Sequence, residues 1–118
     1  MISIVIPTFN EVQNIIPLIK NLIVLISDFE YEIIVVDDDS PDGTSEEVNK
    51  YMSINKRIKL ITRIGRSGLS SAIKEGLIFA KGKYLLVLDG DGQHHPSFIL
   101  NMLEAVSYTH LTLPTTPV

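Results

Sequence analysis

The stretch "YLLVLDGDGQHHP", residues 84–96, decides the fold and raises the main functional question. Its first half is a continuous apolar run, typical of a strand that is buried on both faces of a sheet. The run ends in Asp89 and Asp91, which are separated only by Gly90. Two carboxylates at the end of a buried strand are costly to desolvate unless something positive binds there. We therefore expect this strand to end at a binding site.

Other apolar strands lie upstream along the chain, and a helical pattern follows each of them. This alternation predicts an α/β protein: a Rossmann-like, mostly parallel sheet with helices on both faces. Strands are expected at residues 2–6, 31–36, 57–62 and 83–88, and helices at 10–27, 44–53, 69–82 and 96–106.

Several residues have the chemistry of helix ends. Asn10 is the expected N-cap of the first helix, with Gln13 completing a capping box, and Thr44 with Glu47 has the same pattern. Gly82 is expected to close the third helix, and Pro96 suits the first position of the fourth.

Composition excludes several classes of function. A length of 118 residues suits one domain, and a net charge of −4 without a basic tract argues against nucleic acid as the main partner. The absence of cysteine excludes disulfides and thiolate chemistry.

Met1 leads straight into a strand-like run, so no signal peptide is expected. The apolar run 15–26 is short for a bilayer span and is expected to be a core helix, with membrane contact as the alternative.

Acidic residues gather in three of the predicted loops. The carboxyl ends of parallel strands meet at one crevice of the sheet, so we expect seven carboxylates to face each other there. Their mutual repulsion would be relieved by a cation or by the hydroxyl groups of a ligand. Asp89 and Asp91 are the expected ligands of Mg²⁺ or Mn²⁺, shared with substrate phosphates. The three loops are "PTFNE" (7–11), "DDDSPDG" (37–43) and "DGDGQHH" (89–95).

Three further features allow two interpretations each. The loop "RIGRSGLSSA" (63–72) is either a phosphate cradle with two arginines or a plain turn with solvated arginines. Phe9 either stacks on a base or packs in the core. His94 and His95 are either ligands or helix-capping residues.

The end of the chain does not continue the pattern. Residues 106–115, "VSYTHLTLPT", match the translation of a common transposase-based sequencing adapter, GTC TCT TAT ACA CAT CTG ACG CTG CCG ACG. We therefore expect residues 1–105 to be the N-terminal part of a longer enzyme domain and residues 106–118 to be a non-native read-through tail.

Four segments together resemble a known family. "VIPTFNE", "EIIVVDDDSPDGT", "GRSGLSSAIKEG" and "LLVLDGDGQHHP" occur in the order and spacing of the polyprenyl-phosphate sugar transferases, the dolichol-phosphate mannosyltransferase group of inverting glycosyltransferases with a GT-A fold. The resemblance covers about residues 2–105. Two positions depart from its commonest pattern: Phe9 stands where tyrosine is usual, and "DGDG" replaces "DADL".

The resemblance implies a hexosyl donor such as GDP-mannose or UDP-glucose and a polyprenyl phosphate acceptor. It also implies a location at the cytoplasmic face of a membrane, and we expect the fragment alone to be inactive. By motif, Pro7, Phe9 and Glu11 would contact the nucleotide, and Val36 and Asp38 the base or ribose. The donor and metal would meet Asp89, Gly90, Asp91 and Gln93, with Asp89 and Asp91 as the catalytic and metal-binding pair.

Two other classes remain as alternatives. A phosphatase of the haloacid-dehalogenase type would use Asp89 as nucleophile and Asp91 as acid, but that family carries the motif on its first strand. A receiver-like signalling domain would use "VVDDD" (35–39) as a phospho-acceptor pocket, but its acidic pair would follow the first strand.

Overall fold

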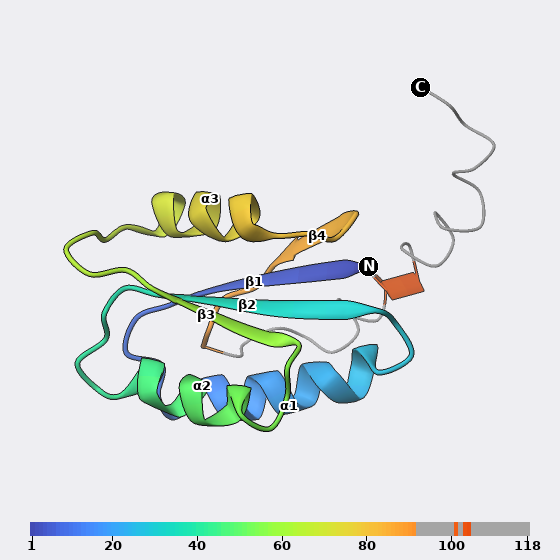
Figure 1. The fold of residues 1–118 in the computed structure, drawn as a ribbon, viewed down its shortest axis with the longest axis horizontal. Helices are drawn as coiled ribbons and strands as arrows, with labels where there is room; N and C mark the ends of the chain where they lie inside the picture. The colour runs from blue at the N-terminus through green and yellow to red at the C-terminus, as the bar shows by residue number, and fades with distance from the viewer. Residues whose placement is uncertain (92–100, 102, 105–118) are drawn as a thin grey trace.

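The computed structural model describes residues 1–91, 101, 103 and 104. Four parallel strands form one sheet in the order β3-β2-β1-β4, so the first strand of the chain lies inside the sheet (Figure 1). Ile4 pairs with Ile33 on one side and with Leu86 on the other. The strands are β1 (Ile2–Thr8), β2 (Tyr31–Asp37), β3 (Ile58–Thr62) and β4 (Tyr84–Val87).

Helices cover both faces of this sheet, which confirms the predicted fold class. α1 (Ile15–Ile26) and α2 (Thr44–Met52) lie on one face, and α3 (Leu69–Phe79) lies on the other (Figure 1). Side chains alternate between the two faces along each strand. Ile4 and Ile33 therefore pack toward α1, whereas Val5 packs toward α3.

α1 is a core helix, as one of the two interpretations predicted. Its buried residues recur at three- and four-residue spacing and join the larger hydrophobic core. None of the helices in the described part of the chain has the length and apolar character that a bilayer span requires. The buried positions of α1 are Ile15, Leu18, Ile19, Leu22 and Ile26.

The predicted start of the first helix is wrong. α1 begins at Ile15 with Asn14 as its N-cap, and Asn10 has a left-handed backbone (φ 55°). The N–H groups of residues 10–12 instead donate to the loop that follows β2 and to the first residue of α2, which holds the segment outside the helix. The acceptors are Ser40 Oγ (2.9 Å), Thr44 Oγ1 (3.1 Å) and Asp42 Oδ2 (3.1 Å).

Two more predicted helix ends need correction. Gly43 (φ 94°) is the N-cap of α2, and Thr44 is its first helical residue, so no capping box forms with Glu47. α3 ends at Phe79, three residues before Gly82. A Cβ at Gly82 would lie 2.7 Å from Met1 O, so this glycine is needed for a close approach of two backbone segments.

The predicted fourth helix falls mostly outside the described residues. Asn101, Leu103 and Glu104 are helical, and Leu103 is buried in the larger core. Gln93, His94, His95, Pro96 and the predicted non-native segment 106–118 lie outside the described part of the chain.

Candidate functional site

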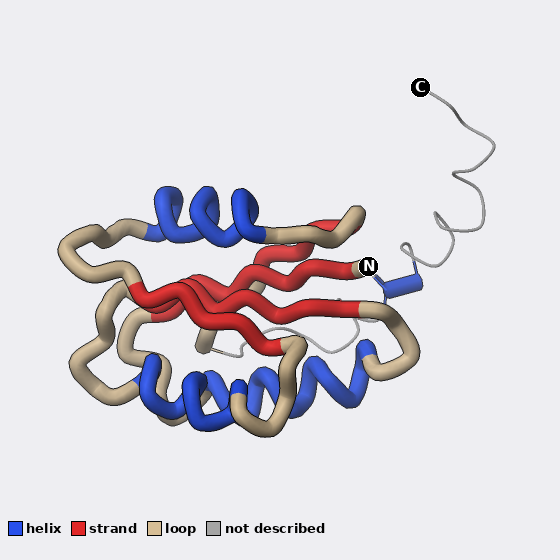
Figure 2. Tube along the Cα trace, viewed as in Figure 1, coloured by secondary structure: helices blue, strands red, loops and turns tan. Residues whose placement is uncertain are grey.

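Loops from three strands meet around Thr8, the last residue of β1. The strands run in the same direction, so the loops that follow them leave from one end of the sheet, on the left in Figure 2. On one side of Thr8, its carbonyl accepts a hydrogen bond from Asp38 N (3.1 Å). On the other side, Gly90 packs so closely that an added Cβ would lie 2.8 Å from Thr8 Cγ2 and 3.2 Å from Pro7 O. Asp38 and the Asp89–Asp91 loop thus flank the same residue.

A pocket of about 440 Å³ opens beside Thr8 on the α3 side. Phe9 is 57% exposed and lines this pocket, so the core-packing interpretation of Phe9 is wrong. Asp38 is the only carboxylate among the lining residues described. The other lining residues are Pro7, Thr8, Ser67, Gly68, Leu69 and Ala72.

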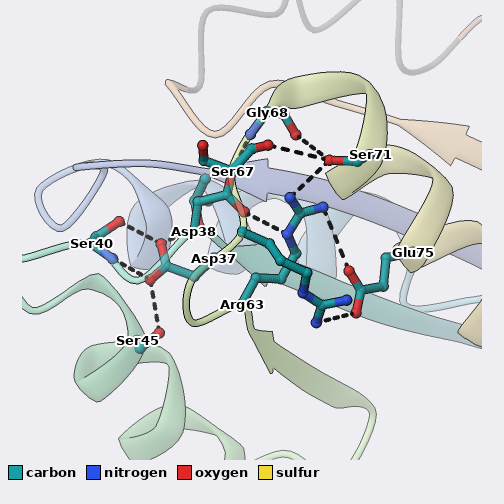
Figure 3. Close-up of polar contacts among 11 residues, drawn as sticks. Asp37, Asp38, Ser40, Ser45, Arg63, Ser67, Gly68, Ser71 and Glu75 are labelled. Atoms are coloured by element: carbon teal, nitrogen blue, oxygen red, sulfur yellow. Dashed lines mark hydrogen bonds and ion pairs between the residues drawn. The ribbon is translucent and has the colours of Figure 1, made fainter.

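The consecutive residues Asp37 and Asp38 have different environments. Asp37 is fully buried toward α2 and accepts hydrogen bonds from Thr8 Oγ1 (2.8 Å), Ser40 Oγ (2.6 Å) and Ser45 Oγ (2.8 Å) (Figure 3). These hydroxyl groups, with the Ser40 N–H at 2.9 Å, compensate for the lost water. Asp37 is therefore a structural residue that fixes the loop after β2, whereas Asp38 reaches the pocket.

Asp42 ties the loops after β1 and β2 together. Its carboxylate accepts from Val12 N (3.1 Å) and from the N–H (3.0 Å) and hydroxyl (2.5 Å) of Thr44. Desolvation alone would raise the pKa of Asp42, but these hydrogen bonds outweigh it and lower the pKa below its ordinary value. Asp42 thus positions the loop through hydrogen bonds to Val12 and Thr44 of the same chain.

These contacts correct the expectation of a crevice with seven mutually repelling carboxylates. Asp37 and Asp42 are satisfied by protein donors, and Asp38 forms an ion pair with Arg63, whose Nε lies 2.9 Å from Asp38 Oδ1. Both interpretations of the loop at 63–72 also fail for Arg63. Its side chain is 1% exposed, so Arg63 is neither a solvated arginine nor accessible to a phosphate.

The Asp89–Asp91 loop remains the candidate metal and diphosphate site. Gly90 is buried against the loop after β1, and the aspartates on either side of it are exposed. The close contacts of Gly90 fix the loop, and two carboxylates suit a hard divalent cation. Among the described residues, no group of three or more acidic or histidine side chains gathers as a metal site. Asp89 and Asp91 therefore fit Mg²⁺ or Mn²⁺ only as a pair that other ligands complete.

The remaining predicted site residues have different placements. Glu11 lies next to Gly90, with 3.2 Å between its Cγ and an added Cβ. Val36 is fully buried in the core under α3, so only its main chain can contact a ligand. Gln93 lies outside the described residues.

Sequence reasoning missed how α3 and the loop before it form one wall of the pocket. Ser67, Gly68, Leu69 and Ala72 line the pocket together with Asp38. The strand register explains this arrangement. Asp37 pairs with Thr62, so the residues that follow them, Asp38 and Arg63, both leave from the carboxyl end of the sheet. This signal appears only when the pairing of β2 with β3 is known.

Comparison with known proteins identifies the family. The model of the family "Glycosyl transferase family 2" matches residues 3–116. The chain is 40% identical over 105 residues to a dolichol-phosphate mannosyltransferase from Pyrococcus furiosus, covering 89% of this chain and 30% of that protein. It is 36% identical over 116 residues to the Saccharomyces cerevisiae enzyme of the same name, covering 96% of this chain and 43% of that protein. The chain thus spans less than half the length of these curated relatives.

Solved structures agree with the family match. The mannosyltransferase PcManGT from Pyrobaculum calidifontis, solved in complex with GDP-Man and Mn²⁺, superposes with a TM-score of 0.60 and 27% identity, covering 76% of this chain and 27% of that one. The predicted GT-A fold is confirmed. The Asp89–Asp91 motif follows β4 and "VVDDD" ends β2, so neither lies after the first strand, and with the family match the phosphatase and receiver alternatives are set aside. The fold, the loops around Thr8 and the family match together show that this chain belongs to glycosyl transferase family 2.

Proposed function

We propose that this chain is the donor-binding part of a glycosyltransferase that moves a hexose from a nucleotide-sugar to a polyprenyl phosphate with inversion. The observation that carries the proposal is the meeting of three loops around Thr8, beside a pocket of about 440 Å³. A nucleotide-sugar needs such an arrangement, with an apolar pocket for the base next to oxygen ligands for a metal diphosphate.

The residues and the relatives support the proposed donor class. Phe9 presents an exposed ring at the pocket mouth, and Asp38 supplies a carboxylate that accepts hydrogen bonds from a base or ribose. Two relatives are named dolichol-phosphate mannosyltransferase, and PcManGT was solved with GDP-Man. These names support GDP-mannose as the donor, with UDP-glucose as the alternative.

The reaction is a displacement at the anomeric carbon. Asp89 and Asp91 would hold Mg²⁺ or Mn²⁺, which when bound neutralises the charge that develops on the leaving diphosphate. An oxygen of the acceptor phosphate forms a bond to the anomeric carbon from the opposite face, and the bond to the diphosphate breaks. The products are a glycosyl phospholipid and a nucleoside diphosphate. The attacking phosphate is already ionised near neutral pH, so the residues of this chain need not supply a strong base.

A lipid acceptor places the reaction at a membrane surface. Because nucleotide-sugars are charged and water-soluble, the donor pocket must face the aqueous side, and we propose the cytoplasmic face. The acceptor site would lie in a part of the longer protein beyond the segments described.

The test is metal-dependent nucleotide binding. We expect Mn²⁺ to strengthen the binding of GDP or UDP, measured by titration calorimetry, and Asp91→Asn to abolish that strengthening because one of two carboxylate ligands is lost. Asp28→Asn, an exposed acid before β2 at the opposite end of the sheet, is the matched control and should bind like wild type. Equal metal dependence in Asp91→Asn and Asp28→Asn would contradict the metal role.

The acceptor class is tested in a chain extended to the length of the curated relatives. We expect labelled hexose to move from GDP-mannose to a polyprenyl phosphate and not to the corresponding polyprenol, because only the phosphate supplies the ionised nucleophile. Transfer to the polyprenol at a similar rate would overturn the proposed acceptor.

A further inference from the structure

Arg63 is a buried cation that the proposed reaction does not use directly. It follows β3, and its N–H donates to Asp37 O (2.8 Å), which fixes its main chain at the carboxyl end of the sheet. Its side chain is 1% exposed. Arg57, at the opposite end of the same strand, is exposed and lies over the Tyr31 ring, 4.8 Å from its centroid. Burying a guanidinium is costly, so its partners must compensate for the lost hydration.

The Arg63 guanidinium connects the loop after β2 to α3. Its Nε lies 2.9 Å from Asp38 Oδ1, its Nη2 donates to Ser71 Oγ (2.8 Å), and its Nη1 lies 3.5 Å from Glu75 Oε2. In Figure 3 the guanidinium lies between Asp38 on one side and the α3 residues Ser71 and Glu75 on the other. One side chain therefore sets the distance between two walls of the pocket.

Asp38 is held at both of its oxygens. Oδ2 accepts from Gly68 N (3.0 Å), and Oδ1 faces Arg63 Nε. The contact with Nε has the distance of an ion pair without the alignment of a hydrogen bond, and no donor among the described residues is aligned on Oδ1. Oδ1 is buried, so the accepting capacity that Asp38 keeps for a ligand lies on Oδ2, because a carboxylate oxygen can accept a second hydrogen bond beside the one from Gly68 N. Its orientation nevertheless depends on Arg63 and Gly68.

Charge in this network alternates. Arg63 lies between the carboxylates of Asp38 and Glu75, and Glu75 also pairs with the exposed Arg66, whose Nη2 lies 2.9 Å from Oε1. Two acids and two arginines balance, so Asp38 needs no metal ion as counter-charge. The pocket side of the site therefore differs from the Asp89–Asp91 side, where a metal ion is expected.

We propose that Arg63 is a positioning residue for nucleoside recognition: it acts through Asp38 and Gly68 and does not touch the ligand itself. The proposal rests on the proposed function in taking the pocket as the site of a nucleoside. It predicts that Arg63 governs affinity for the nucleoside part of the donor and leaves the diphosphate part, at Asp89 and Asp91, unaffected.

The experiment compares two ligands in the presence of Mn²⁺: a nucleoside diphosphate (GDP and UDP) and inorganic pyrophosphate. We expect Arg63→Gln to weaken nucleoside diphosphate binding about 10- to 100-fold, as for a lost charged hydrogen-bond network, and to leave pyrophosphate affinity unchanged. Arg63→Lys keeps the charge but cannot reach both carboxylates, so it should recover part of the loss. Arg57→Gln is the matched control and should bind both ligands like wild type.

The pathway through Asp38 is tested by a double-mutant cycle. In the Asp38→Asn background, Arg63→Gln should cause little further loss of nucleoside diphosphate binding. Additive losses, or equal weakening of both ligands by Arg63→Gln, would overturn the positioning role and indicate a purely structural residue. A wild-type chain that binds pyrophosphate but neither nucleotide would instead overturn the proposed function.

Glu75→Gln keeps the proposal testable if Arg63→Gln does not fold. Glu75 is a partly exposed residue of α3, and its change removes one of the two carboxylates that hold Arg63. We expect nucleoside diphosphate binding to weaken by about 2- to 10-fold with pyrophosphate binding unchanged. Unchanged binding of both ligands in folded Glu75→Gln would overturn the connection from α3 to the pocket.

Discussion

The adjacent residues Asp37 and Asp38 have different roles in this protein. Asp37 ends β2 and faces α2, where serine and threonine hydroxyls satisfy it, and Asp38 faces the opposite side, where it meets Arg63 and the pocket. Alternation along a strand accounts for this difference, because consecutive side chains point to opposite faces. A run of aspartates in a sequence is therefore not evidence of a single shared cation.

Glu32 is a second buried carboxylate, at the amino end of the sheet. It is 1% exposed and accepts from Lys81 N (2.6 Å), Ser3 Oγ (2.6 Å) and Lys59 Nζ (2.9 Å). Desolvation alone would raise its pKa, but these donors outweigh it and lower the pKa of Glu32 below its ordinary value. The ionised form thus stabilises the folded state above the ordinary pKa, and that contribution is lost as pH falls through the lowered pKa.

Glu32→Gln should therefore change the acid stability of the fold. We expect the free energy of unfolding to drop by about 1–3 kcal/mol near neutral pH, because charged hydrogen bonds are lost from a buried site. The difference from wild type should shrink as pH falls from neutral through the lowered pKa of Glu32. Denaturant unfolding across this range measures it, with the exposed Glu30→Gln as control. A constant difference at every pH would contradict the ionic role of Glu32.

At the scale of elements, α3 approaches the sheet through a glycine. A Cβ at Gly76 would meet Val5 Cγ1 inside contact distance and lie 3.1 Å from Val36 Cγ2. This close approach places Leu69 and Ala72 at the pocket and Glu75 beside Arg63. The spacing of α3 from β1 and β2 is thus part of how the site is built.

Gly76→Ala tests that spacing. Alanine favours a helix over glycine by about 1 kcal/mol, whereas overpacking a tight interface costs about 1–3 kcal/mol. We expect the steric cost to exceed the helix gain, so that the free energy of unfolding falls. Lys74→Ala, on the exposed side of α3, should stay within about 0.5 kcal/mol of wild type. A Gly76→Ala chain more stable than wild type would show that α3 can shift without cost.

The elements were largely predictable from the sequence, but their ends were not. Apolar runs and helical spacing predicted all four strands and the helices α1, α2 and α3, because core burial dominates those segments. The ends depended on tertiary contacts: Asn10 is held by Ser40, and Gly82 is packed on Met1. Such contacts join residues far apart in sequence, so local capping patterns could not reveal them.

The candidate site was predictable only in outline. The strand ends indicated that the loops bearing Asp38 and Asp89 would converge, because the carboxyl ends of parallel strands lie at one end of the sheet. The partners of each acid were not predictable, since the roles of Arg63 and Gly68 depend on the register of β2 with β3 and on the position of α3. Composition alone suggested repulsion among acids, whereas the structure has an ion pair at Asp38 and hydrogen-bonded carboxylates at Asp37 and Asp42.

At the scale of the whole molecule, the sheet has an apolar edge at β4. Leu85 is 48% exposed and Val87 is 41% exposed, and the register places both on the α3 face of the sheet beside Ser3 and Val5. Within the described residues, β4 pairs only with β1. An exposed apolar edge strand favours association between chains.

The double variant Leu85→Lys with Val87→Lys should reduce self-association of the 118-residue chain. We expect wild type to show concentration-dependent association in sedimentation velocity and the variant to remain monomeric over the same range, because edge lysines oppose strand pairing. Val24→Lys, an exposed apolar position on α1, should associate like wild type. A wild-type chain that is monomeric at every concentration would contradict the prediction.

The central position of β1 also determines the order in which the protein can be assembled during translation. β1 leaves the ribosome before β2, β3 and β4, yet Ile2 pairs with Tyr84 as well as Tyr31. A nascent chain that has emerged only as far as β3 can form the three-stranded half and must keep one side of β1 uncovered until β4 arrives. Contacts between such distant segments slow folding, so a pause or chaperone during that interval would affect the yield of this chain more than its final stability.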